Sequence, residues 1–150
     1  MATPVREAAL AAVAARLRAQ LPDVALDRAR RGAVDADRER LPRLILRGED
    51  MEADDTQEPG RTHYRIGFSV VAFTRAGSDL ELEQALSALH ARIAAALAGW
   101  VPDTTNLGDV AELSAEFVLY DAEDSAKPAG ECIARFSILA VTPTGDPNIP

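Results

Sequence analysis

The feature that most constrains the fold of this chain is the run from Arg61 to Arg75, in which apolar and polar side chains alternate. Successive side chains of a β-strand point to opposite faces, so this period of two predicts one long strand with a single buried face. A strand of that kind needs a second layer to cover its apolar side. The apolar side chains are Tyr64, Ile66, Phe68 and Val70, and the polar ones are His63, Arg65 and Ser69.

Two amphipathic helices are predicted to supply the covering layer. The first begins after Thr3, its expected cap, has Pro4 at its first position and ends before Pro22. The second begins with the capping box Ser78–Glu81 and ends at Gly99. Each helix has one apolar stripe, which is typical of a helix packed on a sheet. The stripes are Leu10, Val13, Leu17 and Leu21 in the first helix and Leu82, Leu86, Leu89, Ile93 and Leu97 in the second.

Four more strands complete the predicted sheet. A short one surrounds Val24 and Leu26, and a second covers Arg43–Arg47. The last two cover Glu112–Asp121 and Cys132–Thr142, where apolar and polar residues alternate again. Both have an apolar face that we expect to be buried, made of Leu113, Ala115, Phe117 and Leu119 in one and of Ala134, Phe136, Ile138 and Ala140 in the other.

The predicted order is α-β-β-β-α-β-β. The acidic run Glu49–Glu58, followed by Pro-Gly, predicts an exposed loop that joins two strands as an extended hairpin. The charged segment Asp27–Arg40 predicts a surface loop, and Pro143–Pro150 an irregular segment. We therefore expect a single α+β domain over residues 1–150, a two-layer sandwich of a mainly antiparallel or mixed β-sheet with two helices packed on one face.

Charge is unevenly distributed along the chain, which has 16 basic and 24 acidic side chains and a formal net charge of −8. Residues 1–75 carry 13 basic and 12 acidic side chains, whereas residues 76–150 carry 3 basic and 12 acidic ones. An acidic half repels phosphate backbones and disfavours tight nucleic-acid binding there.

No apolar run reaches the roughly 18 residues that a membrane span needs, so we expect no membrane association. Arg6 and Glu7 interrupt the stretch that a signal peptide would require, and the lone Cys132 fits a reducing compartment.

Metal-ligating side chains lack a known spacing. His63, His90 and Cys132 fall on three separate predicted elements. The acidic cluster from Asp50 to Asp55 lacks the central glycine and distal glutamate of a calcium-binding loop, and strands flank it on both sides. We therefore expect no bound metal.

Catalytic signatures are missing as well. No serine stands in a Gly-x-Ser-x-Gly context, Cys132 lies in mid-strand among apolar neighbours, and the sequence has no glycine-rich phosphate loop. We expect the chain not to be an enzyme and to use no cofactor. The enzymatic alternative is acid–base catalysis by Asp or Glu in a cleft of the sheet.

Several local sequences, in their order, resemble one protein family. After the first helix and the charged segment comes the strand Leu41–Leu46 (LPRLIL), followed by the acidic hairpin and the strand His63–Val70 (HYRIGFSV). The Leu-rich helix Leu80–Leu97 precedes two strands, the last ending in Phe136–Pro147 (FSILAVTPTGDP). Over nearly the whole chain this layout resembles the tail terminator proteins of long-tailed phages and prophages, the minor-tail-protein-U-like group. Neighbouring tail-completion families share much of it.

The resemblance implies a structural part of a virion. Proteins of that family are small α/β subunits that cap the tail tube as a homohexameric ring, stop tube polymerisation and form the surface for head–tail joining. The implied partners are other copies of the chain, the tail tube protein and a head-completion or connector protein, while DNA only passes through the ring. The implied location is the virion tail, and the bacterial host cytoplasm during assembly. No cofactor, metal or catalytic residue is implied, and the chain can be a monomer in solution.

The charge distribution indicates where subunits of such a ring would meet, because head-to-tail contacts need two different complementary patches. We expect an arginine cluster to face acidic groups of a neighbour or of the tube, and the acidic hairpin to make a second contact. Acidic groups along the channel would let DNA pass without sticking. The candidate interface residues are Arg28, Arg30, Arg31, Arg38, Arg40, Asp50, Glu52, Asp54 and Asp55.

An alternative function belongs to a different class. The chain would then be a small non-enzymatic module that binds a strand or helix of another protein, or another head–tail completion protein. Neither alternative changes the expected fold.

Overall fold

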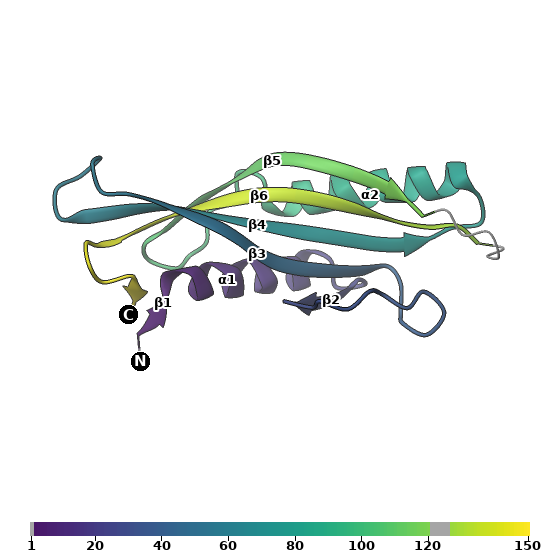
Figure 1. Ribbon diagram of the computed structural model, residues 1–150, viewed down its shortest axis with the longest axis horizontal. Coiled ribbons are helices and arrows are strands. Elements are labelled where there is room, and N and C mark those ends of the chain that lie inside the picture. Colours follow the sequence, from purple (N-terminus) through teal and green to yellow (C-terminus); the bar gives the residue numbers. More distant parts are fainter. Residues whose placement is uncertain (1, 121–126) are drawn as a thin grey trace.

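The computed structural model describes residues 2–120 and 127–150, which form two helices and seven strands in two sheets (Figure 1). The fold is of the predicted α+β class, and the order of its main elements is the predicted one. The helices are α1 (Val5–Gln20) and α2 (Asp79–Leu97). The strands are β1 (Thr3–Pro4), β2 (Ala25–Arg28), β3 (Arg43–Asp54), β4 (Arg61–Arg75), β5 (Leu107–Leu119), β6 (Ala129–Pro143) and β7 (Asn148–Ile149).

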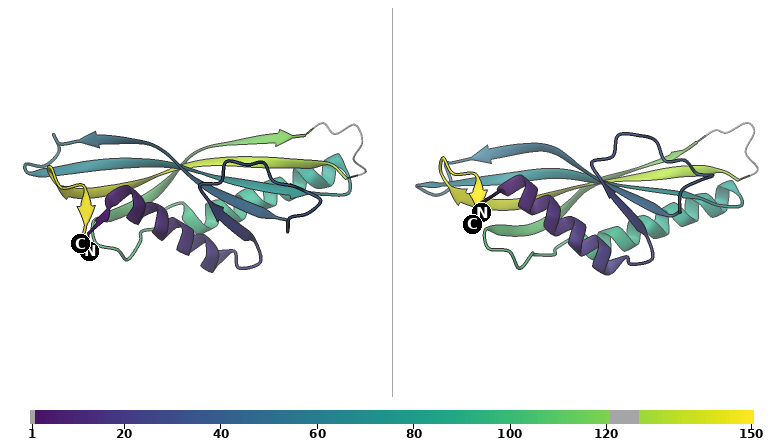
Figure 2. Two further views of the ribbon diagram at one scale, coloured as in Figure 1. Left: turned by 60° about the horizontal axis from the view of Figure 1, so that its bottom comes forward. Right: turned by 90° about the horizontal axis from the view of Figure 1, so that it is seen from below.

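The larger sheet has the strand order β2-β3-β4-β6-β5 and is long and twisted (Figures 1 and 2). Its middle is the antiparallel pair of β4 and β6, in register from Arg61 opposite Pro143 to Arg75 opposite Ala129. β3 and β5 flank this pair, also antiparallel, whereas β2 runs parallel to β3. The sheet is therefore mixed, with one parallel pair of strands.

The core lies between this sheet and the two helices, which cover the same face (Figure 2). Every residue of the two predicted apolar stripes is at most 6% exposed, so both stripes are confirmed. Beneath the helices, Phe68 of β4 and Phe136 of β6 stack with their ring centroids 5.5 Å apart. Burial of this apolar surface is the dominant favourable contribution to folding.

Local sequence signals set the two ends of α2 as predicted. The Ser78 hydroxyl accepts a hydrogen bond from the Glu81 N–H at 3.2 Å, and the Glu81 carboxylate accepts one from the Gly77 N–H. Gly99 follows the helix with a φ of +76°, a left-handed conformation that glycine adopts without steric cost.

The smaller sheet, formed by β1 and β7, was not predicted. The two strands pair antiparallel, and the Val5 N–H donates to the Pro147 carbonyl at 2.8 Å. Thr3 is thus a strand residue and not the cap of α1; Pro4 holds the cap position, and no side chain caps the helix. The segment expected to be irregular is partly strand, and its Ile149 is buried in the core.

Most of the acidic run predicted as a loop is strand. β3 continues to Asp54, so the turn of the hairpin is confined to residues 55–60. A bulge follows Gly48, where two residues of β3 lie opposite Gly67 of β4. A Cβ at Gly67 would lie 3.0 Å from the Asp50 carbonyl oxygen, so a glycine there permits the bulge. The predicted hairpin is confirmed, with longer strands than the apolar pattern indicates.

β5 starts earlier than predicted, at Leu107, and does not bury the face expected for it. As the outermost strand it has a neighbouring strand on one side only, and a shift of register displaces Leu113 from the ladder. Leu113, Phe117 and Leu119 are 60%, 46% and 47% exposed. The prediction of a buried apolar face is therefore wrong at these positions and at Ala115, which is also exposed. The predicted end of the strand, Asp121, lies outside the described residues.

The face of the sheet opposite the helices, here called the helix-free face, is covered over one half. Residues 29–42, here called the strap, leave the end of β2 and line a hollow with Ile45, Val71 and Phe73, which point to this face and are at most 7% exposed. Arg75 donates to Asp37 of the strap at 2.8 Å. The predicted surface loop thus packs on the sheet through part of its length.

Candidate interaction surfaces

Three of the five predicted interface arginines come together in a groove of about 560 Å³ beside β3. Arg28, Arg30 and Arg31 line it together with Arg6 of α1 and Arg47 of β3. We call these five side chains the basic groove. The groove lies where β2 ends and the strap begins, so a helix, two strands and a loop each contribute to it.

Carboxylates of the same chain hold two of these arginines. Arg28 donates to both carboxylate oxygens of Glu7, at 2.7 and 3.1 Å, and this hydrogen bonding keeps the pKa of Glu7 below its usual value. Arg30 donates to Glu39 at 2.7 Å and to Asp27 at 3.2 Å. The hydrogen bond from Arg30 is the main cause that lowers the pKa of Glu39 to about 2. These pairs join the strap and β2 to each other and to α1.

The other three arginines of the basic groove form no ion pair within the described ranges. Arg6 donates to the Glu49 carbonyl at 3.2 Å, and Arg47 donates to the Arg30 carbonyl at 3.3 Å. The exposed Arg31 side chain has neither a hydrogen bond nor an ion pair to any described residue. Glu7 also lines the groove and interacts with the charge of Arg6, but five guanidinium groups against this one carboxylate in the lining give the groove a positive potential.

The two remaining predicted arginines lie away from the groove lining. Arg38 is 3.7 Å from Asp35 within the strap, and Arg40 donates to the Asp23 carbonyl at 2.8 Å. Sequence reasoning missed Arg6 and Arg47, which lie in a predicted helix and a predicted strand. Only the parallel pairing of β2 with β3 brings Arg47 beside the end of β2, and no local sequence signal indicates that pairing.

The predicted acidic contact residues are spread along the hairpin. Asp50 lies in the bulge of β3, Glu52 and Asp54 follow on the strand, and Asp55 begins the turn. The Asp54 carboxylate accepts a hydrogen bond from the Thr56 hydroxyl at 2.6 Å, which is the main cause that lowers its pKa to about 2. Asp50, Glu52 and Asp55 are exposed and Asp54 is half-buried, so the four residues form an acidic border along the hairpin and not a convergent site.

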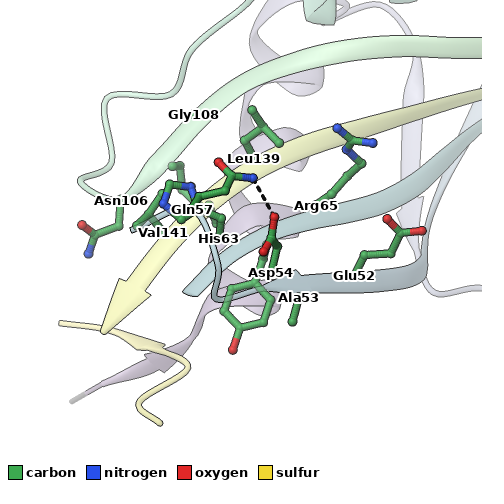
Figure 3. Close-up of a pocket in the computed structure, with 13 residues that line it drawn as sticks. Glu52, Ala53, Asp54, Gln57, His63, Arg65, Asn106, Gly108, Leu139 and Val141 are labelled. Atoms are coloured by element: carbon green, nitrogen blue, oxygen red, sulfur yellow. Dashed lines mark hydrogen bonds between the residues drawn. The ribbon is translucent and has the colours of Figure 1, made fainter. Parts of the chain in front are cut away.

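A second groove, of about 680 Å³, occupies the uncovered half of the helix-free face (Figure 3). His63 and Arg65 of β4 and Leu139 of β6 line it, so the predicted polar face of β4 is confirmed here. Gln57 of the turn donates to Asp54 at 2.9 Å, as Figure 3 shows. The lining mixes both signs of charge with apolar side chains.

The edge of the larger sheet formed by β5, opposite the edge formed by β2, carries acidic and apolar side chains. The His90 Nε2 atom of α2 lies 2.6 Å from Glu112, and the His90 ring contacts the Phe117 ring, so one flank of α2 runs beside β5. Glu83 lies on that flank, seven residues or about two turns before His90. We call this surface the acidic edge and define it by Glu83, Glu112, Glu116, Leu113, Phe117 and Leu119.

The side chains considered for chemistry are separated in the structure. Cys132 is buried in β6, and this burial raises the pKa of its thiol to about 11, so the thiol stays protonated. His63 lies near Glu58 of the turn, and His90 pairs across to β5. In residues 2–120 and 127–150 no three His, Cys, Asp or Glu side chains gather in a way that could hold a metal ion. Over the same part of the chain, neither helix has the length and apolar character needed to cross a membrane.

Comparison with known proteins gives a match at the level of structure. No protein-family profile matches the sequence, and no curated protein sequence does. Solved structures similar to this fold include a chain from the virion of a native gene transfer agent particle. That chain is 15% identical with a TM-score of 0.49, and the similarity covers 87% of this chain and 94% of that chain.

Proposed function

We propose that this protein is a structural virion subunit that caps a phage tail tube as a ring, stops tube polymerisation and forms the surface for head–tail joining. The observation that carries the proposal is the resemblance of nearly the whole sequence to the tail terminator family. The segments behind that resemblance are the LPRLIL strand, the acidic hairpin and the Thr-Gly-Asp-Pro segment. They correspond to the start of β3, the rest of β3 with the β3–β4 turn, and the link between β6 and β7.

The shape of the molecule suits a subunit with several protein contacts. The β3–β4 hairpin extends beyond the helical layer and offers an arm to a neighbour or to the tube (Figure 1). The basic groove and the acidic edge lie toward opposite edges of the larger sheet. A ring of head-to-tail contacts needs two such different surfaces on every subunit.

We propose a non-enzymatic role without a cofactor. The proposed partners are further copies of this chain in a homohexamer, the tail tube protein and a head-completion or connector protein. The proposed location is the virion tail, with assembly in the bacterial host cytoplasm. The exposed carboxylates of the hairpin support a channel through which DNA passes without binding.

The proposal is tested by adding the purified chain to polymerising tail tube protein encoded near its gene. Negative-stain electron microscopy should show shorter tubes of narrower length distribution, with this protein at one end. Tubes of unchanged length and bare ends would contradict the proposal. Binding to a head connector but not to tube ends would instead identify another head–tail completion protein.

A further inference from the structure

We infer that the basic groove of one copy of this chain binds the acidic edge of the next copy, so that identical subunits join head to tail. The inference rests on the proposed ring function and specifies which two surfaces meet. The groove contributes Arg6, Arg31 and Arg47, and the edge contributes carboxylates and exposed apolar side chains.

Three arginine side chains of the groove are available to bind carboxylates of another molecule. Arg28 and Arg30 already have carboxylate partners, whereas Arg6, Arg31 and Arg47 form no ion pair in the described part of the chain. A planar guanidinium binds a carboxylate through two parallel hydrogen bonds, so the chemistry that this groove accepts is an acidic protein surface.

Nucleic acid is a poorer occupant of the groove than a protein carboxylate. The acidic residues of β3, among them Asp50 and Glu52, follow the groove along the same strand and are exposed. They would repel a phosphate backbone that continued past Arg47, and the whole chain has a net charge of −8. A short acidic surface avoids this repulsion.

The acidic edge has the properties of a protein contact that is left open in a single copy. Among the described strands β5 pairs with β6 alone, and the outer main-chain groups of Val110 bind Gly99 and Trp100. Beyond Val110 the outer edge of β5 faces no described strand. A long edge strand of this kind is a template for pairing, and Phe117 and Leu119 add exposed apolar area. Glu83 and Glu116 are exposed and place carboxylates on both sides of the strand; Glu116 lies 3.6 Å from Arg135 of its own chain, and its side chain is still 57% exposed.

The positions of the two surfaces decide what kind of contact they make. β2 and β5 form opposite edges of the sheet, so one copy cannot join its own groove to its own edge. Groove against groove and edge against edge bring like charges together, which disfavours a two-fold dimer through either surface. The contact therefore repeats from copy to copy, and it forms a ring if the rotation between copies closes.

Charge reversal tests the pairing in solution, without tail tubes. The groove variant carries Arg31→Glu and Arg47→Glu, and the edge variant carries Glu83→Arg and Glu116→Arg. A matched control carries Arg18→Glu and Arg65→Glu, two exposed positions outside both surfaces. Sedimentation velocity over a series reaching millimolar protein should show self-association of the wild type and control, weakened at least about tenfold in each variant alone.

Mixing the two variants is the decisive step. In an equimolar mixture the two variants can alternate: the reversed groove of one meets the reversed edge of the other, and the unchanged edge of the first meets the unchanged groove of the second. Every contact then joins opposite charges, so the mixture should associate as strongly as the wild type and with equal amounts of both. Circular dichroism spectra and urea midpoints near those of the wild type show that the variants are folded. A wild type that stays monomeric throughout, variants that associate normally or a mixture that does not recover would each overturn the inference. Loss of wild-type association on adding duplex DNA would assign the groove to nucleic acid and overturn it as well.

Failure of this inference and failure of the proposed function are separate results. A chain that shortens tail tubes but never self-associates keeps the tube-capping function and loses the groove–edge contact. A chain that associates through these surfaces but leaves tubes unchanged keeps the contact and loses the capping function.

Discussion

The two halves of β4 differ in sequence pattern and in their surroundings: the first half alternates, whereas Val70–Phe73 is apolar on both faces. From Phe68 to Thr74 every residue is buried, because the helices cover one face and the strap packs on the other. From Arg61 to Gly67 only Thr62 and Ile66 are buried. The alternation of the first half indicates one apolar face, and the apolar Val71 and Phe73 of the second half lie where the strap, a segment distant in the sequence, covers the other face.

The largest expected effect comes from Phe68→Ala, at the junction of the two halves. The substitution removes a ring that is fully buried and stacked on Phe136, so it should lower the free energy of unfolding by about 3–5 kcal/mol. Urea denaturation followed by circular dichroism measures the loss. The matched control is Phe117→Ala on β5, which should cost about 1 kcal/mol or less because the ring is half exposed. Equal losses would mean that the two aromatic side chains are equally buried in solution.

A second pair of substitutions separates the covered and uncovered halves of the helix-free face. Ile45→Ala, beneath the strap, should cost about 2–4 kcal/mol, whereas Leu139→Ala, in the uncovered half, should cost about 1 kcal/mol or less. The measurement is again the free energy of unfolding in urea. If the two losses agree within error, the strap does not shield the sheet.

The smallest effect concerns the ion pairs that hold the strap. The pKa of Glu39 is about 2 in the folded chain, below its usual value of 4.5, so its stabilising contribution is present above pH 4.5 and is lost as the pH falls toward 2. The urea midpoint of the wild type should therefore fall more steeply over this range than that of Glu39→Gln. Arg30→Gln should flatten the dependence in the same way, because Arg30 is the main cause of the lowered pKa. Parallel curves for all three proteins would argue against this ion pair.

The elements predicted best are those whose signals are local. The capping box Ser78–Glu81, the apolar stripe and Gly99 fix the position of α2 within a few residues of chain. The apolar pattern of β3 stops at Arg47, so the sequence predicts a loop for the part of the strand that follows. Hydrogen bonding to β4 makes it a strand, and that pairing depends on another segment.

The sequence predicts only part of the basic groove, because local signals can be read from it whereas contacts between distant segments cannot. Arg28, Arg30 and Arg31 belong to one charged run, so the sequence alone indicates a basic cluster there. The pairing of Arg28 with Glu7 and the approach of Arg6 both require α1 to pack beside β2 and β3, which no short motif encodes. The contact of these arginines with a neighbouring copy stays a prediction.

The position of β6 has a consequence for how the chain folds as it is synthesised. β6 lies inside the larger sheet, between β4 and the edge strand β5, but follows all the other strands of that sheet in the chain. Until Ala129–Pro143 has left the ribosome, β5 has no partner strand and β4 has one open edge. A nascent chain at that stage exposes the unpaired β5 and the open edge of β4, the kind of species that aggregates or recruits chaperones. The sheet is complete only once β6, the strand that joins β4 to β5, has been made.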